Sequence, residues 1–368
     1  MSNPTEETHQ VTTATPTAAA NSSEALVERL FTAANAAFDI YTTYLGERLG
    51  LYRALAARGP LSPRELAEAT SIDERYAREW LEQQATTGFL QHEGGRFVLP
   101  EDHAAVLAHR DHPSYFAPLA RMMVAAAGQL PSLVSAFGTG DGIGWEEYGL
   151  DIIEGQAELN RPMFIHQLGQ EILPAIPHVH ARLSHPGARV AEVGFGGGWA
   201  SIGIARAYPG VTVEGFDPDV ESVRIATENA VGAGLSSRIA FHGIDGAKAA
   251  ESGRTFDLVC AFECIHDMAN PVGVLASMRR LAGSEGSVLV MDERVADDFT
   301  GQGDEVEKFM YGWSVTACLP NGRAEYPSAA TGTVLRTPVL EGYAREAGFG
   351  GVEVLPIEND FFKFYLLK

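Results

Sequence analysis

Residues 188–210 read ARVAEVGFGGGWASIGIARAYPG, which is a short β-rich run, four glycines and then a helix-forming stretch. Glycines between a strand and a helix let the backbone approach a ligand closely and point free N–H groups at it. In an α/β sheet, such a turn lies in the crevice above the carboxyl ends of the strands. The stretch therefore predicts a strand, a loop and a helix that together bind a nucleotide-like ligand.

The spacing of these glycines narrows the choice of ligand. A dinucleotide fingerprint that begins at Gly194 needs a third glycine at the position of Trp199, where a bulky indole would keep the helix away from the strand. A phosphate-binding P-loop would need Gly-Lys-Ser/Thr, which does not follow. What remains is an acid followed by three alternate glycines, EVGFGGG, over residues 192–198.

The sequence after residue 186 alternates between short strands and helices, which predicts a mostly parallel sheet covered by helices on both faces. The last two runs, at 350–357 and 361–368, are separated by only three residues. So short a link requires an antiparallel hairpin, because a parallel crossover needs a dozen or more residues. The strand runs are expected at 188–193, 211–217, 238–245, 256–263, 286–293, 350–357 and 361–368.

Residues 24–102 have the element order of a winged helix. Ser62, Pro63 and Glu65 predict a helix start with a capping box. The remaining expected elements are two helices before residue 60, a helix over 73–88 and two short strands hinged at Gly94 and Gly95.

The second helix of this winged helix, DERYAREWLEQQA, carries four acids against two arginines, which argues against a DNA-reading helix. We expect Tyr76, Trp80, Leu81 and Phe89 to be buried in the core or in a subunit interface instead.

Residues 103–185 predict helices that could roof a small-molecule pocket. The most apolar stretch, over 115–137, contains Arg121, two prolines and a glycine, so two packed helices broken near 128–131 are favoured over a membrane span. Most of Met122, Met123, Phe137 and Phe164 should be core residues.

The composition restricts the partners and the compartment. The 368 residues carry a net charge of −21, which disfavours nucleic acid and anionic membrane surfaces and leaves small or neutral partners. The three cysteines show no zinc-like spacing, which favours a reducing cytoplasm. Residues 1–23 have no apolar core of a signal peptide and are expected to form a disordered leader.

From residue 186 to 368, the chain resembles the Rossmann-like, S-adenosylmethionine-dependent methyltransferases. The resemblance rests on the EVGFGGG loop, on the strand order and on the antiparallel last hairpin. With the winged-helix segment (24–102) and the helical segment (103–185) in front, the chain resembles the small-molecule O-methyltransferase group. This implies an α/β fold with a seven-stranded sheet and an antiparallel last strand, behind an N-terminal all-helical, winged-helix domain that pairs subunits.

The same resemblance implies a cofactor site. The loop of Gly194, Phe195, Gly196 and Gly198 would contact the methionine half of S-adenosylmethionine, with Glu192 anchoring the loop or the amino group.

Two later strand ends complete the expected cofactor site. Asp217, followed by Pro218, would bind the ribose, and a carboxylate can accept hydrogen bonds from both hydroxyls of a cis-diol. The alternative role, capping the next helix, suits Asp219 better. Asp245 and Gly246 would contact the adenine, although Asp-Gly is also an ordinary turn signal.

Phe262 and Glu263 would flank the adenosyl pocket, with strand-end packing as the alternative. The resemblance further implies that His266, next to Asp267, removes a proton from an acceptor hydroxyl while the methyl group arrives. Imidazole titrates near neutral pH, which suits a general base. Its acid partner could be Glu325 or an acid of residues 291–299.

Several alternatives stay open at this level. His266 could merely cap the helix that starts at Pro271. No tryptophan follows the His-Asp pair, as it does in the plant enzymes, so the methyl could go to nitrogen, sulfur or carbon. No metal ligands can be assigned, but Glu263 and His266 with a third ligand such as Cys318 could hold a divalent ion that chelates an α-keto acid or a catechol.

The wider expectations are an enzyme of secondary metabolism, with O-methylation of a small molecule as its reaction. Two alternative hypotheses are that the protein is a related enzyme that uses the cofactor without transferring its methyl group, or that it is a winged-helix transcription regulator. The aromatic second half of residues 291–322, which contains Phe309 and Trp313, should close over the acceptor. We expect a homodimer through the N-terminal helices, which would otherwise expose apolar surface.

Overall fold

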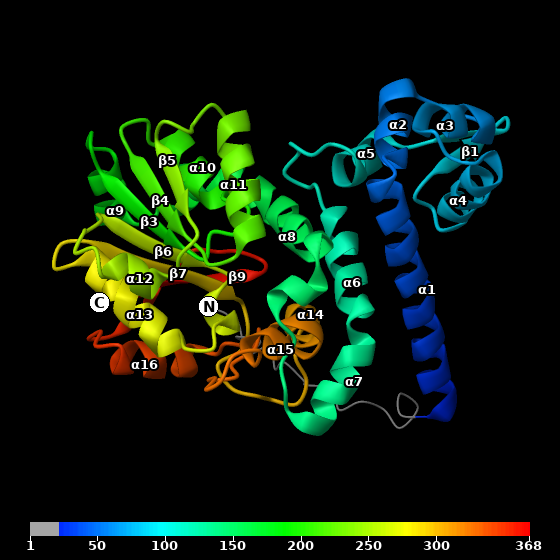
Figure 1. Cartoon of the computed structure of the whole chain (residues 1–368). Helices are drawn as coiled ribbons and strands as arrows, with labels where there is room; N and C mark the ends of the chain where they lie inside the picture. The colour runs from blue at the N-terminus through cyan, green and yellow to red at the C-terminus, as the bar shows by residue number, and fades with distance from the viewer. Residues whose placement is uncertain (1–21) are drawn as a thin grey trace, which may run out of the picture.

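The computed structural model describes residues 22–368 and consists of a small N-terminal domain, a helical middle and an α/β domain (Figure 1). Nearly all of the leader predicted for residues 1–23 lies outside the described residues. The first helix begins at Ser23, where the side chain of Ser22 accepts a hydrogen bond from the backbone N–H of Ala25.

The N-terminal domain has the winged-helix order that the sequence predicts. The capping box is present, because Ser62 accepts from the backbone N–H of Glu65 while the Glu65 carboxylate accepts from the backbone of Ser62. Asp73 caps the following helix. The elements are α1 (Ser23–Arg48), α2 (Leu51–Arg58), α3 (Pro63–Thr70), α4 (Glu74–Thr86), the antiparallel strands β1 (Gln91–Glu93) and β2 (Arg96–Val98), and α5 (Glu101–Leu107).

The expected burial of Tyr76, Trp80, Leu81 and Phe89 is only partly observed. Trp80 and Leu81 are buried in the core of the winged helix, and Phe89 is half-buried. Tyr76 is 78% exposed, so it does not lie in the core, and its burial in a subunit interface stays a prediction. It sits on the outer face of α4, which the helical periodicity alone did not separate from the inner face.

Helices without strands form the middle of the chain, residues 103–185. The predicted break near 128–131 is confirmed, because α6 and α7 meet there at an angle of 52°. Phe137 is 75% exposed and Met123 is also exposed, contrary to the expectation of a core position. The elements are α6 (Pro118–Gly128), α7 (Leu130–Thr139), η2 (Trp145–Tyr148), α8 (Leu150–Met163), the π-helical η3 (Phe164–Ile172) and α9 (Pro177–Leu183).

No single helix among residues 22–368 is long and apolar enough to cross a membrane. The bent pair of α6 and α7 reaches that length and apolarity only when the two helices are taken together.

The α/β domain contains the predicted seven-stranded sheet, in the order β5-β4-β3-β6-β7-β9-β8. The first five strands are parallel, and β9 pairs antiparallel with both β7 and β8. The strands are β3 (Arg189–Val193), β4 (Thr212–Phe216), β5 (Ile239–His242), β6 (Leu258–Phe262), β7 (Ser287–Glu293), β8 (Val352–Val354) and β9 (Phe362–Leu367).

Two apolar layers hold helices on the faces of this sheet. One layer joins it to α9, η3, α10 and α11, and the other joins it to α12, α13 and α16. The long insertion after β7 forms α14, η5 and α15, which lie between the sheet and α7 in Figure 1. The remaining bounds are α10 (Trp199–Ala207), α11 (Val220–Gly232), α12 (Gly246–Ala250), η4 (Ile265–Asp267), α13 (Pro271–Ala282), α14 (Glu305–Trp313), η5 (Ser314–Cys318), α15 (Leu319–Gly322) and α16 (Thr337–Glu346).

Candidate active site

The glycine loop between β3 and α10 adopts a backbone that other residues rarely tolerate. Gly194, Gly196 and Gly198 have φ values of 71°, 50° and 73°, in the left-handed region. A Cβ at Gly194 would lie 2.7 Å from Cys264 Sγ, and one at Gly198 would lie 2.5 Å from Phe241 Cζ. At Gly196, no atom lies within 4 Å of that position. The loop is therefore packed at both ends and open in its middle.

Two carboxylates lie beside this loop. Glu192, near the end of β3, is buried and accepts a hydrogen bond from Ser201 of α10, and burial raises the pKa of Glu192 to about 8. Asp217 follows β4, and its two oxygens accept from the backbone N–H groups of Gly196 at 3.1 Å and Asp219 at 3.0 Å. Burial raises the pKa of Asp217 to about 6. The carboxylate of Asp217 thus contacts the backbone of Gly196, the loop residue that has free space beside it.

The other two strand ends carry helix caps. Asp219 accepts from Ser222 N at 2.7 Å and caps α11, as the sequence predicts. Asp245 accepts from Lys248 N at 2.7 Å and caps α12, so the ordinary turn role is present. Gly246 is buried and Pro218 exposed. Adenine recognition by Asp245 and Gly246 stays a prediction.

His266 lies in the short helix η4, which leaves β6 at the carboxyl edge of the sheet, and it is only 2% exposed. Its Nδ1 is 2.8 Å from Asp292 Oδ1 and 3.2 Å from Glu293 Oε2, both at the end of β7. Burial disfavours the imidazolium, but the carboxylates of Asp292, Glu293 and Asp267 outweigh it and raise the pKa of His266 well above 6.5.

Of the acids that the sequence left open, Asp292 is the one that lies nearest to Nδ1 of His266, at hydrogen-bond distance. Asp292 belongs to the predicted segment 291–299, whereas Glu325 is exposed. A carboxylate only accepts hydrogen bonds, so it fixes the proton of a neutral His266 on Nδ1 and leaves the Nε2 lone pair free. The alternative cap role is wrong, because the side chain of Asn270 caps α13.

Glu263 joins this cluster. It has a φ of 52°, which is unusual for a residue with a side chain, and its carboxylate accepts from the side-chain amide of Asn160 on α8. Burial raises the pKa of Glu263 to about 8. The neighbouring Phe262 packs its ring 5.6 Å from that of Phe164. Flanking of the adenosyl group by Phe262 and Glu263 stays a prediction, and the structure groups Glu263 with His266.

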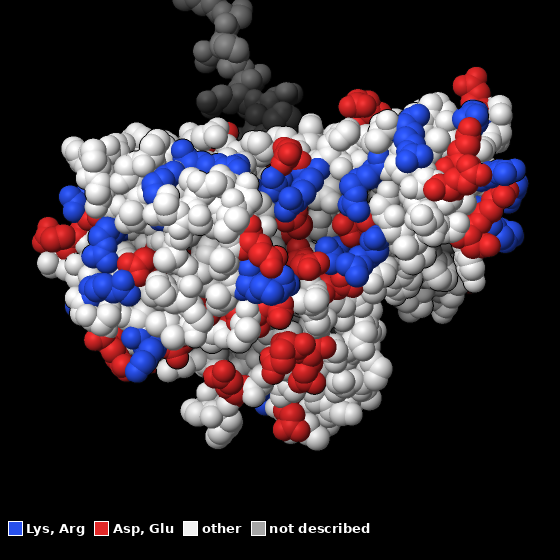
Figure 2. Space-filling model, turned by 45° about the horizontal axis from the view of Figure 1, so that its top comes forward, with Lys and Arg blue, Asp and Glu red and all other residues white. Residues whose placement is uncertain are grey.

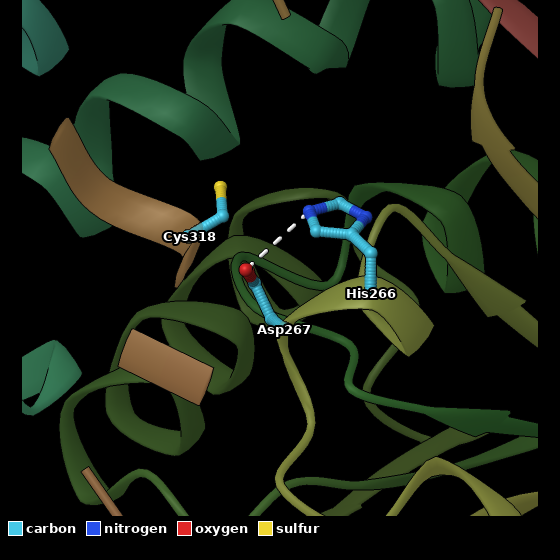
Figure 3. Close-up of side chains that lie close together, drawn as sticks. All are labelled: His266, Asp267 and Cys318. Carbon is cyan, nitrogen blue, oxygen red and sulfur yellow. Dashed lines mark ion pairs between the residues drawn. The ribbon is translucent and has the colours of Figure 1, made fainter. Parts of the chain in front are cut away.

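A cavity of about 290 Å³ opens above His266. It lies among α8, η3, α14 and the segment before β9. Phe309 and Trp313 line it, and their closing over an acceptor stays a prediction. Figure 3 shows His266, Asp267 and Cys318 close together, and all three line the cavity. Seven aromatic side chains and four amides also line it, namely Tyr115, Phe116, Trp145, Phe309, Trp313, Phe361, Phe362, Gln156, Asn160, Gln167 and Asn359.

Two parts of the chain match known families. Residues 184–329 match the family model described as a methyltransferase domain, and residues 36–109 match the Rv2258c-like winged HTH domain. The chain carries an S-adenosylmethionine-dependent methyltransferase domain. The winged helix precedes this domain, and the fold class predicted from the sequence is confirmed.

Curated relatives of this chain are ubiquinone biosynthesis O-methyltransferases. The protein of Rhizobium leguminosarum bv. trifolii is 30% identical over 104 residues, which is 28% of this chain and 40% of that protein. The protein of Rhizobium johnstonii is 24% identical over 175 residues, 48% of this chain and 67% of that protein. The similarity to the first relative thus spans less than half of its length.

Solved structures match nearly the whole chain in fold. Human N-acetylserotonin methyltransferase, solved with S-adenosylmethionine, has a TM-score of 0.69 at 18% identity, covering 95% of this chain and 99% of that one. An O-methyltransferase family protein from Burkholderia thailandensis has 0.65 at 16% identity, covering 93% and 97%. Mitomycin 7-O-methyltransferase has 0.69 at 18% identity, covering 94% and 98%.

The residues at the glycine loop fit the cofactor of the methyltransferase domain. The free space at Gly196 admits a ligand against the backbone, and the Asp217 carboxylate beside it can accept from ribose hydroxyls. Glu192 connects the strand before the loop to the helix after it, because it accepts a hydrogen bond from Ser201.

Sequence reasoning missed the contribution of α8 to this site. Asn160 reaches Glu263, and the guanidinium of Arg161 lies 4.6 Å from the ring centre of Trp199, the residue that breaks the dinucleotide motif. The polar and aromatic mixture of the helical middle suggested a pocket roof, but no local pattern shows which of its side chains face the sheet.

Proposed function

We propose that this protein transfers a methyl group from S-adenosylmethionine to an aromatic hydroxyl of a small molecule, with His266 as the general base. The observation that carries the proposal is the hydrogen bond of 2.8 Å between Nδ1 of His266 and Asp292. In the neutral ring this bond keeps the proton on Nδ1 and leaves Nε2 of a cavity-lining residue able to accept one. The carboxylates that raise the pKa of His266 make that neutral ring a stronger base, and it forms once the imidazolium has released its proton. The curated O-methyltransferase relatives of this chain support oxygen as the atom that is methylated.

The bound cofactor supplies an electrophilic methyl group on a positively charged sulfur. The chain's own residues provide positioning and proton removal. Asp217 would hold the ribose hydroxyls and the loop around Gly196 would hold the methionine half. His266 Nε2 would accept the hydroxyl proton while the oxygen bonds to the methyl carbon and the carbon–sulfur bond breaks, because a phenolate attacks faster than a phenol.

The cavity lining supports a planar aromatic acceptor. Aromatic rings such as Trp145 and Trp313 offer flat apolar faces, and amides such as Gln156 and Asn359 offer both donors and acceptors. Displacement at a sulfonium requires water to be kept out, and the helix α14 that carries Trp313 covers the cavity.

The test is a mass-spectrometric search for products heavier by one methylene after incubation with S-adenosylmethionine and a panel of phenols, keto acids and amines. We expect methylated phenols from the wild type, and a loss of about 100-fold or more in His266→Asn. The surface variant His109→Asn is the control. Unimpaired transfer by His266→Asn, or methylation of amines alone, would reject the proposal.

A calorimetric titration tests the cofactor site separately from the chemistry. We expect Asp217→Ala to weaken S-adenosylhomocysteine binding by about 10-fold or more, since a hydrogen bond to a charged group contributes about 1.5–3 kcal/mol. His266→Asn should bind the same compound as the wild type does. If Asp217→Ala bound S-adenosylhomocysteine as tightly as the wild type does, Asp217 would not be a cofactor-binding residue.

We further propose a homodimer through α1 and α7. Helix α1 packs against α6 with one side, while Leu30, Phe31 and Phe38 on it are 62%, 69% and 61% exposed. On α7, Val134 is 77% and Phe137 75% exposed. Apolar surface of this extent on two helices favours burial against a second copy of the chain.

The charge pattern supports a small-molecule partner over nucleic acid. On α4, Arg75 pairs with Glu79 and Arg78 with Glu74, so an acid that would repel a phosphate lies beside each arginine. Figure 2 shows Lys and Arg scattered among Asp and Glu on the face that it draws.

A cytoplasmic location and a role in secondary metabolism complete the proposal. The three cysteines form no disulfide, which agrees with a reducing compartment. The fold similarity to mitomycin 7-O-methyltransferase supports an acceptor of natural-product type.

A further inference from the structure

Three potential metal ligands of different chemistry meet on the floor of the cavity. One ligand atom from each of His266, Asp267 and Cys318 lies within 4.8 Å of the other two, and Nε2 of His266 is the ring nitrogen that faces Oδ1 of Asp267. His266 and Asp267 come from η4, whereas Cys318 is the last residue of the π-helical turn η5 (Figure 3). The tertiary fold therefore brings an imidazole and a carboxylate from residues 266 and 267 together with a thiol from residue 318.

We propose that His266, Asp267 and Cys318 bind a divalent metal ion of the zinc class, and that the bound ion blocks the proton acceptor of the proposed reaction. The nitrogen, oxygen and sulfur atoms of this set are the three ligand types that Zn²⁺ takes in proteins. This goes beyond the sequence-based alternative, in which Glu263 was a ligand. In the structure, Asp267 is the acid that lies with His266 and Cys318, whereas the carboxylate of Glu263 accepts a hydrogen bond from Asn160.

The spacing of the ligand atoms fits a tetrahedral ion. Two N or O ligands bound to one Zn²⁺ at about 2.0–2.1 Å lie roughly 3.3–3.4 Å apart at the tetrahedral angle. The distance from His266 Nε2 to Asp267 Oδ1 is 3.4 Å. Three protein ligands with the fourth position open to a cavity is the arrangement of zinc sites that exchange water or ligands.

The hydrogen bond on the Nδ1 side of the His266 ring also supports a metal ion at Nε2. Metal-binding histidines almost always donate their other N–H to a carboxylate or carbonyl, which orients the ring. Asp292 accepts from Nδ1 of His266 at 2.8 Å. A second group of possible metal ligands among the described residues consists of His266, Asp292 and Glu293. The 2.8 Å between Nδ1 and Asp292 is too short for two ligands of one tetrahedral zinc ion, so we do not assign the metal to this group.

The charge of the cluster favours a cation. Four carboxylates, Glu263, Asp267, Asp292 and Glu293, surround His266, and within residues 22–368 no Lys or Arg forms an ion pair with any of them. One buried oxygen each of Asp267, Asp292 and Glu293 has no hydrogen-bond partner among the described residues. Buried carboxylate oxygens without partners are costly unless a cation or a proton compensates them.

Ion binding would have a defined effect on the reaction. The ion takes the Nε2 lone pair of His266, and the Cys318 thiol releases its proton to solvent as the thiolate binds. His266 can then no longer accept the hydroxyl proton. This consequence rests on the proposed function, whereas the existence of the site does not.

The site is tested with Co²⁺, which takes tetrahedral zinc sites and absorbs light. The full-length protein, dialysed against a chelator, is titrated with Co²⁺ while the near-ultraviolet thiolate-to-cobalt charge-transfer band is recorded. We expect the band to saturate at one ion per chain, to vanish in Cys318→Ser, and to persist in Cys260→Ser, whose thiol lies within β6. No band in the wild type, or an equal band in folded Cys318→Ser, would overturn the site.

Asp292→Asn provides a second variant that keeps the three ligands. Removal of a carboxylate that orients a metal-binding histidine weakens metal affinity by about 10–100-fold, so we expect a shift of that size in the cobalt titration. An unchanged midpoint would contradict the proposed geometry.

The blocking effect is tested with Zn²⁺ in the methyl-transfer assay. We expect added Zn²⁺ to lower the rate and a chelator to restore it, and Cys318→Ser to need at least about 10-fold more Zn²⁺ for the same loss. Activation by Zn²⁺ would overturn the blocking effect. If no methyl transfer occurs under any condition, the proposed function fails while the cobalt titration still decides the site.

Discussion

At the scale of single residues, Asp292 decides which nitrogen of His266 faces the cavity. Its carboxylate lies 2.8 Å from Nδ1 and can only accept, whereas an amide can also donate. In Asp292→Asn, the amide N–H₂ can donate to Nδ1, which moves the ring proton to Nε2. We expect kcat to fall by about 100-fold or more with a much smaller change in KM, because the base is lost while the cavity remains.

Two readouts separate this positioning role from a structural one. Nitrogen NMR of the imidazole should report the proton on Nδ1 in neutral wild-type His266 and on Nε2 in Asp292→Asn. Glu293→Gln, whose carboxylate is 3.2 Å from the same Nδ1, is the matched control and should keep the wild-type tautomer. An equal loss of kcat in both variants would contradict the assignment of Asp292.

Glu192 makes the stability of the protein depend on pH. Burial raises its pKa from 4.5 to about 8. Between these values, the unfolded chain has lost a proton that the folded chain keeps, so the free energy of unfolding falls as the pH rises from about 4.5 to about 8. In Glu192→Gln, the side-chain amide oxygen can still accept the hydrogen bond from Ser201, but the group does not titrate, so the free energy of unfolding no longer falls with pH on its account.

The measurement is the unfolding temperature of both proteins, without cofactor, from pH 5 to pH 8.5. We expect the difference between Glu192→Gln and wild type to grow in favour of the variant across this range, by several degrees at its upper end. A difference that is constant with pH would show that Glu192 does not titrate as described.

At the scale of elements, the loop between β3 and α10 contains one glycine that permits close packing, Gly198, and one that leaves space for a ligand, Gly196. Gly196 and Gly198 both have left-handed φ values, which cost another residue about 1–2 kcal/mol. A Cβ at Gly198 would also meet Phe241 at 2.5 Å and Ala226 at 2.8 Å, while one at Gly196 meets nothing within 4 Å. Gly198→Ala should therefore lose more stability than Gly196→Ala.

Cofactor binding should show a different pattern in this pair. The side chain of Gly196→Ala would project into the space that we assign to the cofactor, so S-adenosylhomocysteine should bind at least 10-fold more weakly although the protein remains folded. Calorimetry and thermal unfolding of both variants give the comparison. Wild-type affinity in Gly196→Ala would place the cofactor elsewhere.

At the scale of the whole molecule, the exposed faces of α1 and α7 predict the oligomeric state. The double variant Phe31→Glu with Phe38→Glu places charges on the most apolar side of α1, where burial against a second copy would leave them unpaired. We expect light scattering to report a dimer for the wild type and a monomer for this variant at micromolar concentration.

The matched control for this experiment is Val220→Glu, which changes an apolar residue on α11 that is 75% exposed. It should remain dimeric. A wild-type monomer, or a dimer that survives both charges on α1, would reject the interface.

The sequence determined much of the fold because its signals are local. The capping box at Ser62, the β-rich strands and the glycines of the loop each depend on neighbours within a few residues, and the short link before the last strand forced its antiparallel direction. The same local signals carried the resemblance to methyltransferases that implied the cofactor, and they placed His266 after a buried strand at the sheet edge.

Tertiary structure alone decided how the site is assembled. Asp292 on β7, Asn160 on α8 and Cys318 on η5 converge on η4 from distant parts of the chain, and no spacing in the sequence encodes such a meeting. It likewise decided that Tyr76 and Phe137 face outward, because helical periodicity indicates an apolar side but not what packs against it. Contacts within one element follow from local chemistry, whereas contacts between elements follow from how the whole chain packs.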